Sequence, residues 1–118
     1  MQITLQWPPR ELSPNTAVRL HWAKKMKAKQ TYRDYCFFDT KAQAVGGFKE
    51  GRIPVSIMFH PPRNTGDIDN MLAAAKSGID GMCGALGIND KRLRPMTLDV
   101  GEKVRGGRIV ITFEVQNA

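Results

Sequence analysis

The chain has 118 residues, 42% of them hydrophobic and 25% charged, and 18 Lys and Arg against 11 Asp and Glu give a formal net charge of +7. These values suit one globular domain, residues 1–118, and exclude collagen-like, coiled-coil and disordered chains. Apolar runs stay well below the ~20 residues of a membrane helix, and the first ten residues lack the basic start and apolar stretch of a signal peptide, so we expect a cytoplasmic protein without a membrane partner.

The first half of the chain predicts a strand followed by a long helix. Residues 3–7 alternate between apolar and polar side chains and are rich in β-forming residues, which is typical of a short strand that ends at the following prolines. Pro14, between Ser13 and Asn15, indicates a helix start. The helix is expected over residues 16–44 and ends at Gly46-Gly47.

The second half predicts a buried strand over residues 53–59, a helix over residues 67–86, and two strands over residues 96–100 and 109–115. The last two strands are expected to form a hairpin around Gly106-Gly107. The order β-α-β-α-β-β predicts an α+β (α/β) fold. We expect a mixed four-stranded sheet with two main helices that cover one or both of its faces.

The first predicted helix carries a run of basic residues with no acid before Asp34: Arg19, Lys24, Lys25, Lys27, Lys29 and Arg33. Residues 1–60 hold net charge +6 and residues 61–118 hold +1, so the positive charge is concentrated in this half. Like charges on one helix repel one another unless a polyanion neutralises them. We expect these side chains to contact DNA phosphates, together with Arg10 and Arg63. The alternative is an ordinary solvated surface.

Apolar residues of the same helix fall within about a third of its circumference: Val18, Trp22, Met26, Tyr32 and Cys36. We predict that this stripe belongs to the core and is not a platform for base stacking. Cys36 and Cys83 lie in no CxxC pair and far from histidines at metal-ligand spacing, so we predict buried free thiols and exclude a zinc site.

The second predicted helix combines acids with a lysine. At 3.6 residues per turn, Asp69, Lys76 and Asp80 form one stripe, a quarter-turn from the predicted core face. That face consists of Leu72, Ala75, Ile79, Met82 and Leu86. Asp67 precedes the helix and Asp90 follows it. Asp90 reaches the first acids only if the helix ends early or if the chain turns back after it. The glycines at 78, 81, 84 and 87 allow an early or bent end.

Two or three aspartate oxygens with water suit Mg²⁺, which activates water at a phosphate. A lysine on the same stripe can hold the attacking water or a phosphate oxygen. The same residues also have structural interpretations. Asp67 can cap the helix, and Asp69 can interact favourably with the positive end of the helix dipole. Lys76 and Asp80 can form an i,i+4 pair.

Taken together, these residues resemble the signature of the RusA family, crossover-junction endodeoxyribonucleases that resolve Holliday junctions. The resemblance rests on Asp67-Ile68-Asp69-Asn70, Lys76, Asp80-Gly81 and Asn89-Asp90. Segments near the N-terminus are also similar: Trp7-Pro8-Pro9, Ser13-Pro14-Asn15, Arg19 and His21-Trp22-Ala23-Lys24. The likeness spans about residues 3–115.

The resemblance implies that Asp67, Asp69 and Asp90 bind Mg²⁺ or Mn²⁺ and that Lys76 is catalytic, with Asn70 and Asp80 in supporting roles. It implies a bacterial or prophage-encoded homodimer that nicks four-way DNA junctions symmetrically. Two features depart from the family pattern. Asn89 stands where members often carry an acid, and the interval from Asp69 to Lys76 is longer by about one helical turn than in some members.

Two other functions remain open at this stage. The chain can be a non-enzymatic DNA-binding module whose acids are structural. It can also be a metal-dependent phosphotransferase that acts on a nucleotide, although it lacks a glycine-rich phosphate loop. Incubation of a four-way junction with and without Mg²⁺ separates the nuclease from the binding module.

Overall fold

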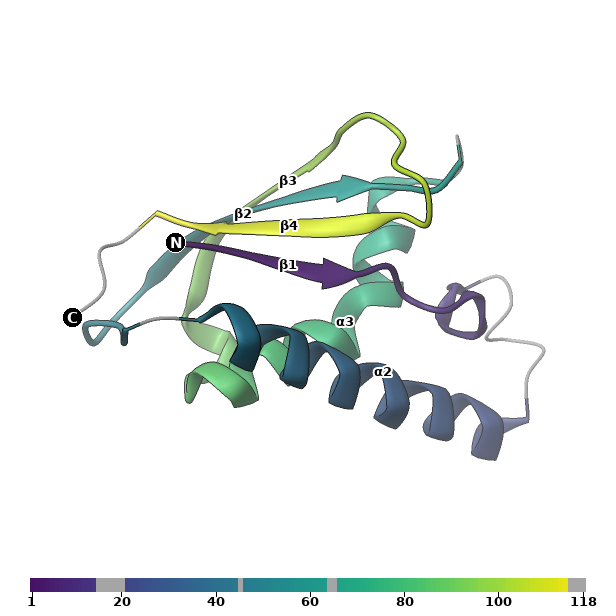
Figure 1. Ribbon diagram of the computed structural model, residues 1–118, viewed down its shortest axis with the longest axis horizontal. Helices are drawn as coiled ribbons and strands as arrows, with labels where there is room; N and C mark the ends of the chain where they lie inside the picture. The colour runs from purple at the N-terminus through teal and green to yellow at the C-terminus, as the bar shows by residue number, and fades with distance from the viewer. Residues whose placement is uncertain (15–20, 45, 64–65, 115–118) are drawn as a thin grey trace.

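The computed structural model describes residues 1–14, 21–44, 46–63 and 66–114 (Figure 1). In this part of the chain, α-helices α2 (Trp22–Gln43) and α3 (Ile68–Leu86) lie on one face of a mixed four-stranded sheet. The strands are β1 (Gln2–Gln6), β2 (Ile53–His60), β3 (Leu93–Val100) and β4 (Arg108–Phe113), and the short 3₁₀ turns are η1 (Arg10–Leu12) and η2 (Asp90–Arg92). The predicted α+β class and element order are confirmed.

The strand order in the sheet is β1-β4-β2-β3. β4 pairs antiparallel with both β1 and β2, whereas β2 and β3 run parallel and are connected through α3. The predicted hairpin between the last two strands is therefore wrong, because β2 lies between them. Burial explains the order. Ile109, Ile111 and Phe113 alternate into the core along β4, which takes a central place, whereas β3 is exposed along most of its length and occupies an edge.

The core lies between the helices and the inner face of the sheet. Alternate residues of β1, β2 and β4 are buried there against Ala75, Ile79 and Met82 of α3. Cys36 and Cys83 are buried free thiols, as predicted. Burial raises the pKa of each thiol to about 12, so both stay protonated at neutral pH. Neither described helix has the length and apolarity needed to cross a membrane.

Side chains of α2 form hydrogen bonds with backbone groups on the outer edge of β1. The amide of Gln43 both donates to Thr4 O at 2.7 Å and accepts from Thr4 N at 2.8 Å. Asp39 accepts from Gln6 N, and the Tyr32 hydroxyl donates to Gln6 O at 2.7 Å. These bonds occupy backbone groups that another strand would otherwise pair with, and they fix α2 against the sheet.

The apolar stripe of α2 is buried only in its second half. Tyr32, Cys36 and Thr40 are buried, whereas Trp22 is 71% exposed and Met26 is 53% exposed. The prediction that Trp22 and Met26 belong to the core is wrong, and Val18 lies outside the described residues. A helix buries its apolar side only where another layer lies beneath it. The first turns of α2, which carry the lysines, have no such layer of described residues beneath them.

The glycines of α3 serve helix packing. The helix continues through Gly78, Gly81 and Gly84 and ends at Gly87, whose φ of 70° is left-handed, so the expected early end is wrong. A Cβ at Gly78 would overlap the Tyr32 ring, and one at Gly81 would overlap the backbone carbonyl of Arg33. The missing side chains allow α2 and α3 to approach closely.

Candidate active site

The acids at the start of α3 are exposed. Asp67 occupies the N-cap position with φ of −90° and ψ of 151°, but its side chain makes no capping hydrogen bond. Asp69 lies in the first turn, where a negative charge favours the helix dipole. Asp67 is thus the N-cap residue, as one interpretation predicted, but its side chain does not cap the helix, and neither carboxylate accepts a hydrogen bond from a described residue.

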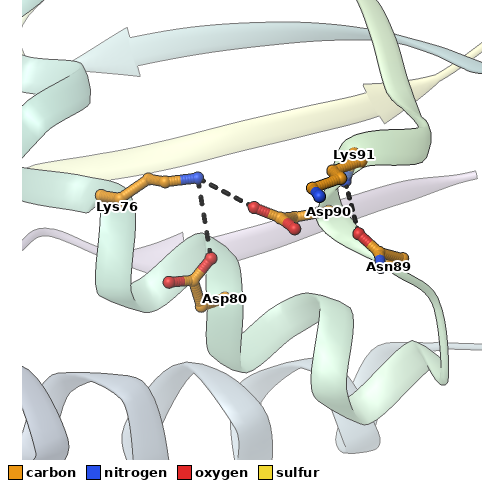
Figure 2. Close-up of polar contacts among 5 residues, drawn as sticks. All are labelled: Lys76, Asp80, Asn89, Asp90 and Lys91. Atoms are coloured by element: carbon orange, nitrogen blue, oxygen red, sulfur yellow. Dashed lines mark hydrogen bonds and ion pairs between the residues drawn. The ribbon is translucent and has the colours of Figure 1, made fainter.

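Lys76 connects two aspartates from different parts of the chain (Figure 2). Its Nζ donates to Asp90 Oδ2 at 3.0 Å and lies 3.7 Å from Asp80 Oδ1. The Lys76 side chain is 59% exposed and each aspartate side chain 39% exposed. The i,i+4 pair of Lys76 and Asp80 is thus confirmed, and Asp90 extends it to a three-residue cluster at the surface of α3.

The turn after α3 brings Asp90 to Lys76. At Gly87 the chain leaves the helix with backbone bonds from Gly87 N to Gly84 O and from Ile88 N to Cys83 O. Asn89 Oδ1 then accepts from Lys91 N at 2.9 Å and starts η2. Asn89 stands where members of the RusA family often carry an acid. Here it has a local structural role, because it fixes the turn that carries Asp90.

The hydrogen bond between Lys76 and Asp90 stabilises both charges. It raises the pKa of Lys76 above its ordinary value and lowers the pKa of Asp90 below its ordinary value. Lys76 is therefore an ammonium group at neutral pH. It can donate a hydrogen bond to a phosphate oxygen, but it cannot act as a proton acceptor.

We expect Lys76→Met to return the pKa of Asp90 toward the ordinary carboxyl value of about 3.9. NMR titration of the Asp90 carboxyl measures this shift. Lys91→Met is the matched control, because it removes an adjacent lysine whose side chain does not pair with Asp90. Since a lowered folded-state pKa stabilises the protein only while the carboxyl is ionised, this contribution is lost as the pH falls through that pKa. Solvent exposure limits it to less than about 1 kcal/mol. An unchanged Asp90 pKa in Lys76→Met would contradict the contact.

The three predicted metal ligands do not form one cluster. Within residues 1–14, 21–44, 46–63 and 66–114, no group of three His, Cys, Asp or Glu side chains is arranged to hold a metal ion. Asp69 precedes Lys76 by seven residues, roughly 10 Å of helix rise, and Asp90 is held at Lys76. Asp67 and Asp69 alone suit Mg²⁺, which keeps several waters beside one or two carboxylates. The shared site with Asp90 remains a prediction.

The other predicted site residues that the structure describes line surface grooves. Arg10, Arg63 and Asn70 line a groove of about 410 Å³. The α2 lysines are divided between two further grooves. Arg19 lies outside the described residues.

One residue near the site was predicted only as a phosphate contact of the basic run, and another was not predicted at all. Arg33 lines a groove with Asp80, Asn89 and Asp90. The basic run predicted Arg33 as a phosphate contact, but not its position beside these acids. Ser77 lies next to Lys76 and lines a groove with it. No pattern in the sequence singles out this serine as a groove residue.

Comparison with models of known protein families finds no match to this chain. A search of curated proteins finds a relative in Xylella fastidiosa (strain Temecula1), described only as an uncharacterized protein. It is 40% identical over 115 residues, which cover 94% of this chain and 74% of the relative.

Proposed function

We propose that this protein is a metal-dependent endodeoxyribonuclease that cuts four-way DNA junctions. The chain belongs to the same family as the uncharacterized protein of Xylella fastidiosa. The observation that carries the proposal is the contact between Lys76 and Asp90, 14 positions apart and 3.0 Å from each other. These are two of the residues to which the RusA resemblance assigns catalysis, and the turn after α3 brings them together.

Charge supports the proposed substrate. Two of the α2 lysines lie beside the Lys76 cluster, since Lys25 and Lys29 line one groove with Lys76. A phosphodiester gains negative charge at its oxygens during hydrolysis, and a fixed ammonium group beside it stabilises that charge. Lys76, held in position by Asp90, can supply such a group.

A divalent metal, when bound, would supply an activated water and further charge neutralisation at the phosphate. Asp67 and Asp69 are the residues that would hold it. Asp90 has a second role in the structure, because it orients Lys76. The proposed homodimer would present two such sites to the two symmetry-related strands of a junction. We place this activity in the cytoplasm of a bacterial cell.

We expect paired, symmetric nicks in a labelled four-way junction with Mg²⁺ and no nicks with a chelator. Linear duplexes with the sequences of the junction arms are the matched substrate control and should stay intact. Light scattering of the same preparation gives the oligomeric state, which should be a dimer.

A second candidate function is that of a non-enzymatic DNA-binding module. It is supported by the finding that Asp67, Asp69 and Asp90 do not form one cluster. If the protein binds the junction tightly but does not cut it with Mg²⁺ or Mn²⁺, the function is that of a DNA-binding module. That outcome would contradict the nuclease proposal while leaving the basic surface in its role.

A further inference from the structure

The lysines near the start of α2 face two different grooves. Lys24 and Lys27 line a groove with Trp7 and Tyr32, on the side of β1. Lys25 and Lys29 line a second groove, on the side of α3. Four residues that look equivalent in the sequence thus form two pairs with different surroundings.

The second groove, hereafter the lysine groove, lies between η1, α2 and α3 and has a volume of about 480 Å³. This volume falls in the range typical of sites for small ligands. Lys25, Lys29 and Lys76 contribute its positive charges. Its other lining is mainly apolar and comes from Leu12, Pro14, Ala73 and Ala74.

The lysine groove has positive charge without matching negative charge. Its acidic lining residue is Asp80, which lies 3.7 Å from Lys76. Among the described residues, Lys25 and Lys29 form no ion pair. An anion that enters the groove therefore meets two uncompensated ammonium groups.

Ser77 adds an unused hydrogen-bonding group to the same groove. Its Oγ is buried and has no hydrogen-bond partner among the described residues. The buried Thr40 behaves differently, since its Oγ1 donates to the carbonyl of Cys36, one turn earlier, at 2.8 Å. Buried hydroxyls normally find such a partner, so the Ser77 hydroxyl is a donor left without an acceptor next to the groove, within the part of the chain that the structure describes.

We infer that the lysine groove holds one nucleotide unit of a DNA strand. Its phosphate lies between Lys25 and Lys29 and accepts a hydrogen bond from Ser77, while its sugar and base cover the apolar lining. This inference rests on the proposed function. Lys76 lines the groove and also pairs with Asp90, so a strand bound here reaches the Lys76 cluster.

Two alternatives fit the same surface less well. A second copy of the chain, docked about a two-fold axis on this groove, would bring Lys25 and Lys29 of both copies together and would be repelled. The groove of Lys24 and Lys27 is a weaker phosphate site. It contains Glu11, and its Tyr32 hydroxyl already donates to Gln6 O at 2.7 Å.

Two double variants with the same loss of charge on the same helix test the inference: Lys25→Ala with Lys29→Ala, and Lys24→Ala with Lys27→Ala. Fluorescence anisotropy measures binding to a four-way junction without divalent metal over a range of salt. Each lost phosphate contact lowers the slope of log K against log salt by about 0.9. We expect a reduction of roughly 1.8 for the Lys25/Lys29 variant and a much smaller one for the Lys24/Lys27 variant. Equal reductions would overturn the inference.

Ser77→Ala gives a readout that does not depend on charge. We expect weaker binding with an unchanged salt slope, because the variant removes a hydrogen bond and no ionic contact. Unchanged affinity would show that Ser77 does not donate a hydrogen bond to the phosphate.

Methyl NMR locates the ligand directly. Titration with a short oligothymidylate should shift the methyl signal of Ala73, in the lysine groove, more than that of Ala28, in the groove of Lys24 and Lys27. A larger shift at Ala28 would place the strand in the other groove and overturn the inference.

These binding experiments need no cleavage, so they separate the inference from the proposed nuclease. If the wild-type protein cuts junctions but the two lysine pairs behave alike, the groove assignment fails and the nuclease stands. If the protein never cuts but the Lys25/Lys29 pair alone controls binding, the groove assignment stands and the nuclease fails.

Discussion

Asp67→Asn and Asp69→Asn are each expected to abolish junction cleavage and to leave junction binding unchanged or tighter. Asparagine keeps the shape of the side chain but removes the charge that would hold a divalent metal. The loss should exceed the roughly 10–100-fold effect typical of residues that only orient a metal ligand. Binding should be spared because the proposal assigns it to the lysines of α2, and less negative charge near the phosphate reduces repulsion.

Asp99→Asn is the matched control, since it makes the same charge change at an exposed position of β3. Single-turnover nicking with Mg²⁺ and anisotropy without metal should be measured for all three variants. Normal cleavage by both Asp67→Asn and Asp69→Asn would show that the acids at the start of α3 have no catalytic role, and it would contradict the nuclease proposal.

The strands and helices follow closely from local sequence patterns, but the sheet order does not. The alternation of Ile109, Ile111 and Phe113 predicts a strand with one buried face wherever that strand lies. Which strand it pairs with depends on contacts across the whole chain. The turn at Gly106-Gly107 suggested a hairpin, since neighbouring strands usually pair. Here the exposed β3 cannot fill the centre of the sheet, and β4 pairs with β1 and β2.

Burial on α2 was predicted correctly where the helix has a partner and wrongly where it does not. The periodicity that places Tyr32 and Cys36 in the core also places Trp22 and Met26 on nearly the same side. Periodicity says which side of a helix is apolar, but not how far along the helix the second layer extends. That extent depends on where α3 lies.

The candidate site was predicted in part. The helical spacing of Lys76 and Asp80 predicts their pairing. The contact with Asp90 is not local, because it depends on the turn at Gly87 and on the Asn89 side chain that starts η2. The grouping of all three metal ligands required an early end of α3 or a chain that turns back as far as Asp67 and Asp69. The helix does not end early, and the turn brings Asp90 to Lys76. Two of the glycines that suggested an early end, Gly78 and Gly81, serve instead to bring α2 and α3 together.

The role of these glycines leads to the largest expected effect on stability, that of Gly81→Ala. The new Cβ would overlap the backbone carbonyl of Arg33 in α2, and a backbone atom cannot move aside as a side chain can. Forcing an extra methyl into a packed interface costs about 1–3 kcal/mol, occasionally more. This cost exceeds the gain of about 1 kcal/mol that alanine brings to a helix interior. We therefore expect a lower free energy of unfolding in urea and a melting temperature reduced by several degrees.

Gly84→Ala is the matched control on the same helix, one turn later. Its new Cβ would meet the Phe37 ring at 3.8 Å, an ordinary contact, so only the gain in helix propensity remains. We expect this variant to be more stable than the wild type by up to about 1 kcal/mol. Opposite signs for two identical substitutions three residues apart would locate the helix contact at Gly81. If both variants were stabilised, α2 would not approach α3 closely at Gly81, and the two walls of the lysine groove would lie farther apart.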